Sequence, residues 1–87
     1  MNTAYPTEIT RVAITTDGST AIAAYFASEA MFRATSFSPS AQSDAAIIAD
    51  ALATLPAPHR IATNAEFVVT RDPGDGSVIS TTSTIPQ

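Results

Sequence analysis

The stretch SPSAQSDAAIIADALATL, residues 38–55, decides the fold. Ser38 or Ser40 can cap a helix, Pro39 suits a first helical turn, and Asp44 lies near the positive N-terminal end. Apolar residues recur at steps of four and three and form one stripe, made of Ala41, Ala45, Ile48, Leu52 and Leu55. The side chains of Gln42, Ala46, Asp50 and Ala53 point away from it. Because Pro56-Ala57-Pro58 stops a helix, we predict one amphipathic helix over Ser40 to Leu55, packed on a sheet.

The residues before this helix predict a β-hairpin and a third strand. Ile9 to Thr15 is rich in β-branched residues, and Asp17-Gly18 marks a turn. A three-residue loop with Gly18 in the left-handed conformation, preferred over a two-residue loop, places five apolar residues on one face: Val12, Ile14, Ile22, Ala24 and Phe26. Thr20 to Arg33 also has the alanine content and spacing of a helix, which is the alternative. On the hairpin interpretation the chain turns at Ser28-Glu29-Ala30, and Met31 to Phe37 returns as a strand.

The residues after the helix predict a second hairpin. Ile61, Thr63, Ala65, Phe67 and Val69 alternate with polar residues, as in a half-buried strand. Residues 72–76 form a loop of five, which sets Val69 opposite Ile79 in a last strand over 77–85. The expected fold is α+β: a small antiparallel sheet of four or five strands in ββ(β)αββ order, with one helix on one face. Residues 1–87 are expected to be a single domain in which 1–7 form an extended arm.

The composition argues against most enzyme classes. The 87 residues include no Cys, no Lys, no Trp and a single His, so nucleophile, base and orienting group would come from a very short list. His59 stands between the helix stop and a strand, with no recognisable acid-base partner near it in sequence. The acidic loop 72–76 lacks the alternating ligands and closing Glu of a calcium loop. We therefore expect no enzyme, no cofactor and no metal.

The charge and hydropathy patterns exclude two further partner classes. Eight acidic residues and four arginines give a net charge of −4, and the arginines form no basic stripe that could bind nucleic acid. The longest apolar run, Ala21 to Ala27, is far shorter than the roughly 20 residues of a membrane span. The N-terminus does not resemble a signal peptide. We expect a cytoplasmic protein that binds neither nucleic acid nor membrane.

Two surfaces are predicted to bind a partner. Only 14% of residues are charged, against roughly 25% in typical soluble domains, which favours association. The last strand carries no charge and no proline before Pro86, whereas edge strands usually carry blocking residues. It is therefore either central in the sheet or pairs with a partner. Its candidate contact residues are Val78, Ser80, Thr82 and Thr84. The second surface is an exposed Tyr25 flanked by Arg11 and Arg33, the composition of an interaction hot spot. The alternative for Tyr25 is a second sheet face that is covered.

These features predict a small non-enzymatic protein that binds another protein. Its size and compactness suggest an inhibitor of a host protein complex, of the kind that phages and other mobile elements encode. The alternative is a structural subunit of a homomeric or virion-type assembly. A homodimer through the C-terminal strand, by strand addition, belongs to this alternative.

Overall fold

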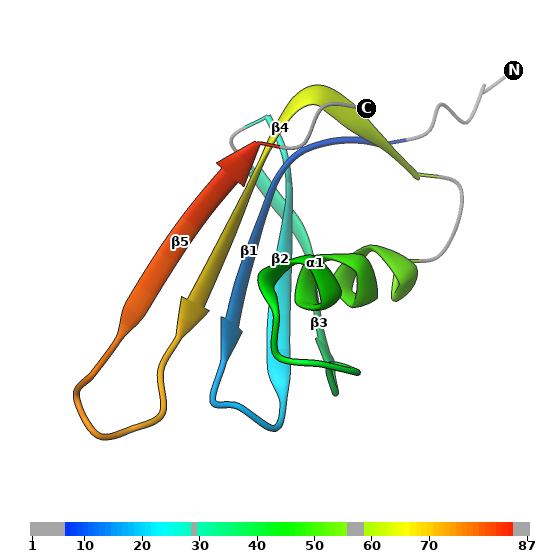
Figure 1. The fold of residues 1–87 in the computed structure, drawn as a ribbon. Coiled ribbons are helices and arrows are strands. Elements are labelled where there is room, and N and C mark those ends of the chain that lie inside the picture. Colours follow the sequence, from blue (N-terminus) through cyan, green and yellow to red (C-terminus); the bar gives the residue numbers. More distant parts are fainter. Residues whose placement is uncertain (1–6, 29, 56–58, 85–87) are drawn as a thin grey trace, which may run out of the picture.

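The computed structural model describes residues 7–28, 30–55 and 59–84, which form a five-stranded sheet and one helix (Figure 1). The elements are β1 (Thr7–Thr16), β2 (Ala21–Ala27), β3 (Ala30–Phe37), α1 (Asp44–Ala53), β4 (His59–Arg71) and β5 (Ile79–Thr84). The strands lie in the order β3-β2-β1-β4-β5. The expected small α+β fold is therefore confirmed, including the choice of strand over helix for β2.

The sheet is mixed, which corrects the expectation of a purely antiparallel one. β1 and β4 are parallel neighbours, while the other three strand pairs are antiparallel. The reason lies in the connection, because parallel strands need a crossover, usually a helix. After β3 the chain passes through α1, which lies across one face of the sheet, and β4 then enters beside β1 in the same direction (Figure 1).

The turn between β1 and β2 differs from the predicted three-residue loop and inverts β2. Thr16 pairs with Ala21, so the turn spans Asp17 to Thr20. An Asp17 carboxylate oxygen accepts hydrogen bonds from the main-chain N–H groups of Ser19 and Thr20, each at 2.9 Å. The buried Thr16 hydroxyl donates to Thr20 O at 2.9 Å and accepts from Gly18 N at 3.1 Å. These local bonds select the longer turn, which Gly18 accommodates with a φ of +103°.

As a result, the faces of β2 are the reverse of those predicted. Ala21, Ala23 and Tyr25 point into the core, whereas Ile22 is 57% exposed. The side of β1 was predicted correctly, since Val12 and Ile14 are buried.

The helix is shorter than predicted and its buried side is rotated. Ser43, rather than Ser38 or Ser40, caps α1, and its hydroxyl accepts from Ala46 N at 3.2 Å. The residues of the stripe that do face the sheet are Ile48, Leu52 and Leu55, joined by Ile47 and Ala51. Ala41 and Ala45 are exposed, so this part of the stripe was wrong.

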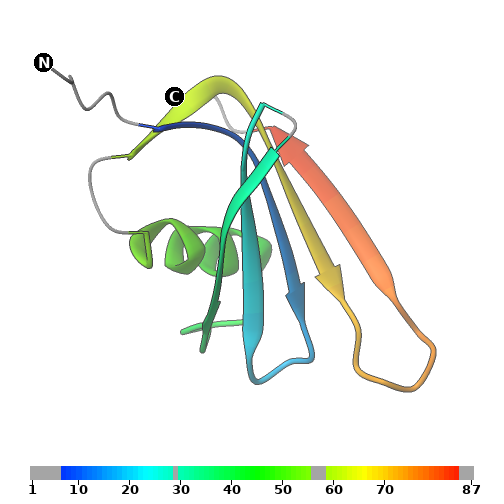
Figure 2. The same ribbon diagram turned by 180° about the vertical axis from the view of Figure 1, so that it is seen from behind.

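The core lies between α1 and one face of the sheet. Its buried residues are Ile9, Val12, Ile14, Ala21, Ala23, Tyr25, Ile47, Ile48, Ala51, Ala65, Phe67 and Val69. None of the β5 residues is among them. Viewed from behind, the sheet twists strongly and β5 lies at the margin farthest from β3 (Figure 2).

The C-terminal hairpin has the predicted faces but a longer loop. Val69 pairs with Thr81 rather than Ile79, and Arg71 pairs with Ile79, so the connection spans Asp72 to Val78. Asp72 accepts from Gly74 N at 3.1 Å and Asp75 from Ser77 N at 2.9 Å, which builds two local turns into this loop. A shift of two residues keeps every side chain on its predicted side.

Some of the sequence predictions fall wholly or partly outside the described residues. These are the arm over residues 1–7, of which only Thr7 is described, as the start of β1, and the helix stop at Pro56–Pro58. The main chain of His59 begins β4, but its side chain is also outside the described part. Within the part of the chain that is described, no helix is long and apolar enough to cross a membrane.

Candidate functional site

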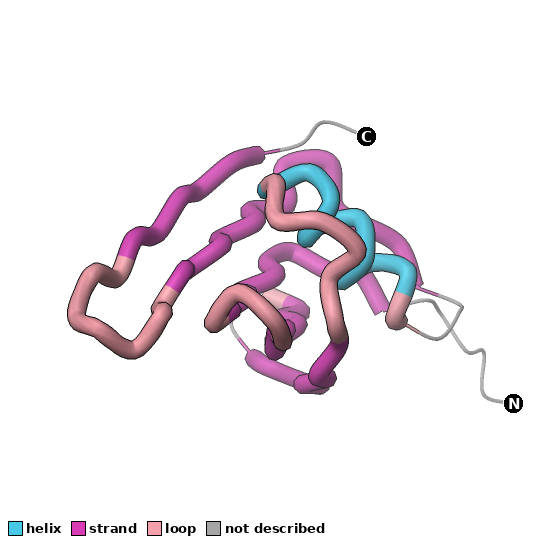
Figure 3. Tube along the Cα trace, turned by 60° about the horizontal axis from the view of Figure 1, so that its bottom comes forward, coloured by secondary structure: helices cyan, strands magenta, loops and turns pink. Residues whose placement is uncertain are grey.

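β5 forms one edge of the sheet and is exposed on both faces. It pairs with β4 on one side, and no other strand in residues 7–28, 30–55 and 59–84 pairs with it. Every side chain from Val78 to Ser83 is exposed, and Val78 and Ile79 are apolar residues at 52% and 59% exposure. Figure 3 shows the β4–β5 hairpin standing away from the rest of the molecule. Of the two positions that the sequence allowed for this strand, central or edge, the structure therefore shows the edge.

The directions of the main-chain groups can be derived from one hydrogen bond. Asp72 N donates to Thr16 O at 2.9 Å, so the main chain of Asp72 faces β1. Main-chain groups alternate in direction along an extended strand, and those of Arg71, Val69 and Phe67 therefore face β5. Their partners Ile79, Thr81 and Ser83 are bonded to β4. The N–H and C=O groups of Ser80, Thr82 and Thr84 consequently point away from the sheet, at its outer edge.

Polar contacts between side chains hold β5 in place. The hydroxyls of Thr70 and Ser80 are hydrogen-bonded at 2.9 Å, and Thr81 Oγ1 donates to Asp44 Oδ2 at 2.8 Å. Asp44 also forms an ion pair with Arg71 at 2.5 Å. The hydrogen bond from Thr81 and the one from Arg71 lower the pKa of Asp44 below its usual 3.8. The first residue of α1 thus anchors the hairpin, although β5 contributes no side chain to the core.

The opposite edge, β3, is irregular. Its pairing with β2 shifts register between Tyr25 and Phe26, which leaves Phe32 as an extra residue in a bulge. It also carries Arg33, whose Nε donates to Thr35 Oγ1 at 3.2 Å. Bulges and charges on an edge strand hinder pairing with another chain. β5 has neither, because its register with β4 is continuous and residues 79–84 are uncharged.

The predicted surface of Arg11, Tyr25 and Arg33 is not formed. Tyr25 is fully buried, and its hydroxyl donates to Ala51 O at 2.6 Å, so the predicted exposure was wrong. Arg33 pairs with Tyr25 in the ladder and lies on the α1 side of the sheet. Arg11 lies on the opposite side, where it forms an ion pair with Glu66 at 3.2 Å and covers the Phe26 ring at 5.6 Å. Because the turn before β2 is longer than predicted, Tyr25 lies on the face of the sheet opposite to Arg11.

The sheet face opposite α1 is a second exposed surface. Cross-strand pairing places on it Arg11, Ala13, Ile22, Ala24, Phe26, Met31, Glu66 and Val68. Ile22 and Met31 are each 57% exposed. The alternating pattern of the sequence could have identified this face, had the turn length been assigned correctly. Its two exposed apolar residues lie on β2 and β3, at the side of the sheet away from β5.

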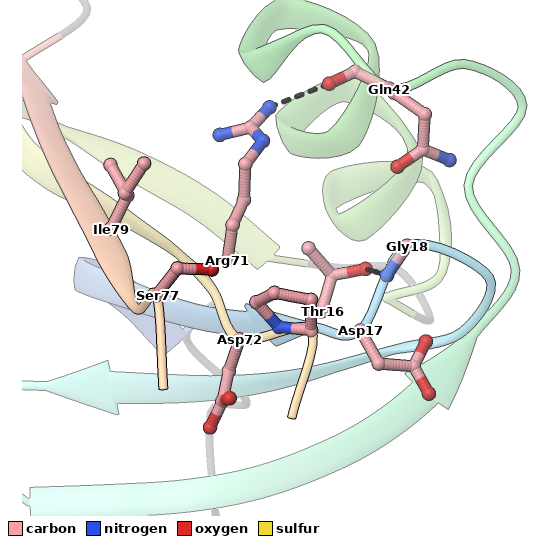
Figure 4. Close-up of a pocket in the computed structure, with 9 residues that line it drawn as sticks. Thr16, Asp17, Gly18, Gln42, Arg71, Asp72, Ser77 and Ile79 are labelled. Atoms are coloured by element: carbon pink, nitrogen blue, oxygen red, sulfur yellow. Dashed lines mark hydrogen bonds between the residues drawn. The ribbon is translucent and has the colours of Figure 1, made fainter. Parts of the chain in front are cut away.

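A pocket of about 300 Å³ lies at the loop end of the sheet (Figure 4). Its lining comprises Thr16, Asp17, Gly18, Gln42, Arg71, Asp72, Pro73, Ser77 and Ile79. Arg71 donates to Gln42 O at 2.6 Å and pairs with Asp44, while Asp17 and Asp72 accept from the main chain of their own turns. The charged groups of the lining are thus bonded within the protein: Arg71 joins β4 to the start of α1, and Asp17 and Asp72 stabilise their own turns.

Comparison with known proteins places no relative beside this chain. No protein-family model, no curated protein sequence and no solved structure matches it. The two exposed surfaces are therefore the features of this chain that bear on its function, and β5 is the more regular of them.

Proposed function

We propose that this chain is a non-enzymatic protein-binding protein, which takes up an extended segment of a partner along β5. The observation that carries the proposal is the uncharged, regular strand β5, in which residues 79–83 are exposed on both faces and the main chain is open along the outer edge. Natural edge strands usually carry a charge, a proline or a bulge that hinders such pairing. In this sheet β3 has two of these features and β5 has none.

The chemistry of strand addition supports the choice of this edge. A partner strand would bond with the outward main-chain groups of Ser80, Thr82 and Thr84, and each net hydrogen bond contributes about 0.5 to 1.5 kcal/mol. Side chains of Ser and Thr are small and tolerate close cross-strand neighbours. Affinity would come from the main chain, and side chains on alternate positions would contribute specificity.

A lysine in β5 tests the proposal. Thr82→Lys places a charge on the face that also carries Val68, opposite to the side of Ile79. Because that position is exposed, the variant should fold, yet association through the edge should be weakened or lost. Ala34→Lys is the matched control, since Ala34 is an exposed residue of the other edge strand. Thermal unfolding measures folding, and light scattering and pull-down from the native host measure association.

The two variants together give a clear decision. Loss of association with Thr82→Lys and retention with Ala34→Lys would support the β5 edge as the binding surface. Equal association of both variants with wild type, at unchanged stability, would contradict it. The narrower expectations of an inhibitor of phage or mobile-element origin and of a cytoplasmic location stay predictions.

A further inference from the structure

We infer that the segment that pairs with β5 is the β5 strand of a second copy of this chain. The inference rests on the proposed function and specifies its partner. The two strands run antiparallel, with a two-fold axis through the sheet at Thr82, so that the two five-stranded sheets become one continuous sheet. Both copies present the same surface to each other, as in a symmetric dimer.

The register follows from the outward main-chain groups. Ser80, Thr82 and Thr84 point away from β4, and these three positions are symmetric about Thr82. In an antiparallel pair, residues that exchange both hydrogen bonds lie opposite each other. Thr82 then faces Thr82 of the second copy, and Ser80 faces its Thr84. All outward groups of the strand are used, which gives on the order of six hydrogen bonds.

The side chains of β5 fit this self-pairing. The same register places Thr81 opposite Ser83 of the other copy, so the positions that meet within residues 80–84 are all Ser or Thr. Cross-strand pairs of Thr with Thr or Ser are favourable, whereas like charges opposite each other destabilise a sheet. Each copy has a net charge of −4, but no charged residue lies between Asp75 and the end of β5. Two copies can therefore approach along this edge without bringing like charges together.

The two edges of the sheet also decide between a closed dimer and a fibre. Pairing of β5 with β3 of another copy would leave edges open and propagate without end. The bulge at Phe32 and the charge of Arg33 oppose that arrangement. Pairing of β5 with β5 uses the one regular edge of each described sheet and leaves β3 outermost. The expected assembly stops at two copies.

A single engineered cysteine tests the register, because the chain has no native cysteine. In the inferred pair the two Thr82 Cα atoms lie about 5.5 Å apart, which suits a disulfide. The Thr82→Cys variant should form a covalent dimer under mild oxidation. Thr81→Cys places the two cysteines on diagonal positions, whose Cα atoms lie about 7 to 8 Å apart. Ala34→Cys places the cysteines on β3, away from the inferred interface. Both of these controls should remain largely monomeric.

Light scattering of the wild-type protein provides the second measurement. Between about 10 µM and 1 mM, a range that covers weak interfaces, the apparent mass should rise from 9.0 kDa toward twice that value. Thr82→Lys should hold the mass at that of the monomer. A wild-type mass that stays at 9.0 kDa throughout this range would overturn the inference, as would cross-linking of Thr81→Cys in place of Thr82→Cys.

The same variants distinguish a failure of this inference from a failure of the proposed function. If the wild-type chain is a monomer but Thr82→Lys abolishes capture of another protein while Ala34→Lys does not, strand addition at β5 stands and the second copy is rejected. If self-association is absent and capture is insensitive to Thr82→Lys, both the inference and the proposed function are rejected.

Discussion

Tyr25 links the sheet to the end of the helix through a single polar group. Its side chain is fully buried, and its hydroxyl bonds to Ala51 O, a carbonyl in the last turn of α1. The last carbonyls of a helix lack partners within the helix, so this bond satisfies an acceptor that burial would otherwise leave unpaired. Burial raises the pKa of Tyr25, and the nearby Arg33 acts in the opposite direction.

We predict that Tyr25→Phe destabilises the protein by about 1 to 3 kcal/mol, because the buried carbonyl of Ala51 loses its donor while the ring still fills the core. Urea unfolding of wild type and variant at neutral pH measures the difference. Phe26→Tyr, a change at a partly exposed neighbour on the other face, serves as the control and should alter stability little. Equal unfolding midpoints for wild type and Tyr25→Phe would contradict this role of the hydroxyl.

Tyr25 also marks a limit of sequence analysis. Alternation along β2 offers two sets for burial, one with Ile22 and Phe26 and the other with Tyr25. Hydrophobicity alone favours the first set. Which of the two sets is buried depends on the hydrogen bonds of Asp17 and Thr16 within the turn. It also depends on the carbonyl of Ala51, 26 residues from Tyr25, which accepts the hydrogen bond of the tyrosine hydroxyl. No local pattern contains that information.

At the scale of elements, the existence of α1 was predictable and its phase was not. Serines before the apolar residues and prolines after them indicate a helix in the sequence, but alanine is so frequent that Ala41 and Ala45 could be counted in an apolar stripe. The larger side chains of Ile47 and Ile48 set the actual phase. The edge position of β5 was not predictable from its sequence, because a strand without charges is equally suited to the centre of a sheet. The parallel pairing of β1 and β4 depends on the crossover through α1, which no residue pattern specifies.

Alternate residues of β5 should respond differently to substitution by proline, because their main-chain groups face β4 and the outer edge in turn. Proline removes a main-chain N–H and is tolerated in an edge strand only where that N–H faces solvent. We predict that Thr81→Pro, which removes a bond to β4, destabilises the hairpin by at least the roughly 0.5 to 1.5 kcal/mol of one net hydrogen bond. Thr82→Pro should cost much less, because its N–H faces the outer edge. Unfolding free energies measure the contrast in dilute solution, and equal losses would refute the derived directions of the main chain.

At the scale of the whole molecule, lowering the pH changes the stability of the fold in two opposite ways, through the net charge and through local hydrogen bonds. Protonation of carboxylates relieves the repulsion that accompanies a net charge of −4. However, Asp17, Asp44, Asp50 and Asp75 each accept hydrogen bonds in the folded chain, and each has a lowered pKa. A carboxylate with a lowered pKa in the folded state stabilises the fold above its ordinary value of 3.8, and this contribution is lost as the pH falls through the lowered pKa. The local hydrogen bonds act at contact distance, whereas the repulsion is spread over the whole surface. We therefore expect the loss of these bonds to outweigh the relief of repulsion, so that acid destabilises the protein.

Asp44 provides the sharpest test, since it joins α1, β4 and β5. Asp44→Asn should be less stable than wild type at pH 6, because the ion pair with Arg71 is lost. The gap between their unfolding midpoints should narrow as the pH is lowered to about 2, where the wild-type carboxyl also becomes neutral. Thr81→Val, which removes the hydroxyl that contributes most to the lowered pKa of Asp44, should flatten the same dependence. Parallel curves for wild type and Asp44→Asn over the whole range would show that this carboxylate does not link the helix to the hairpin.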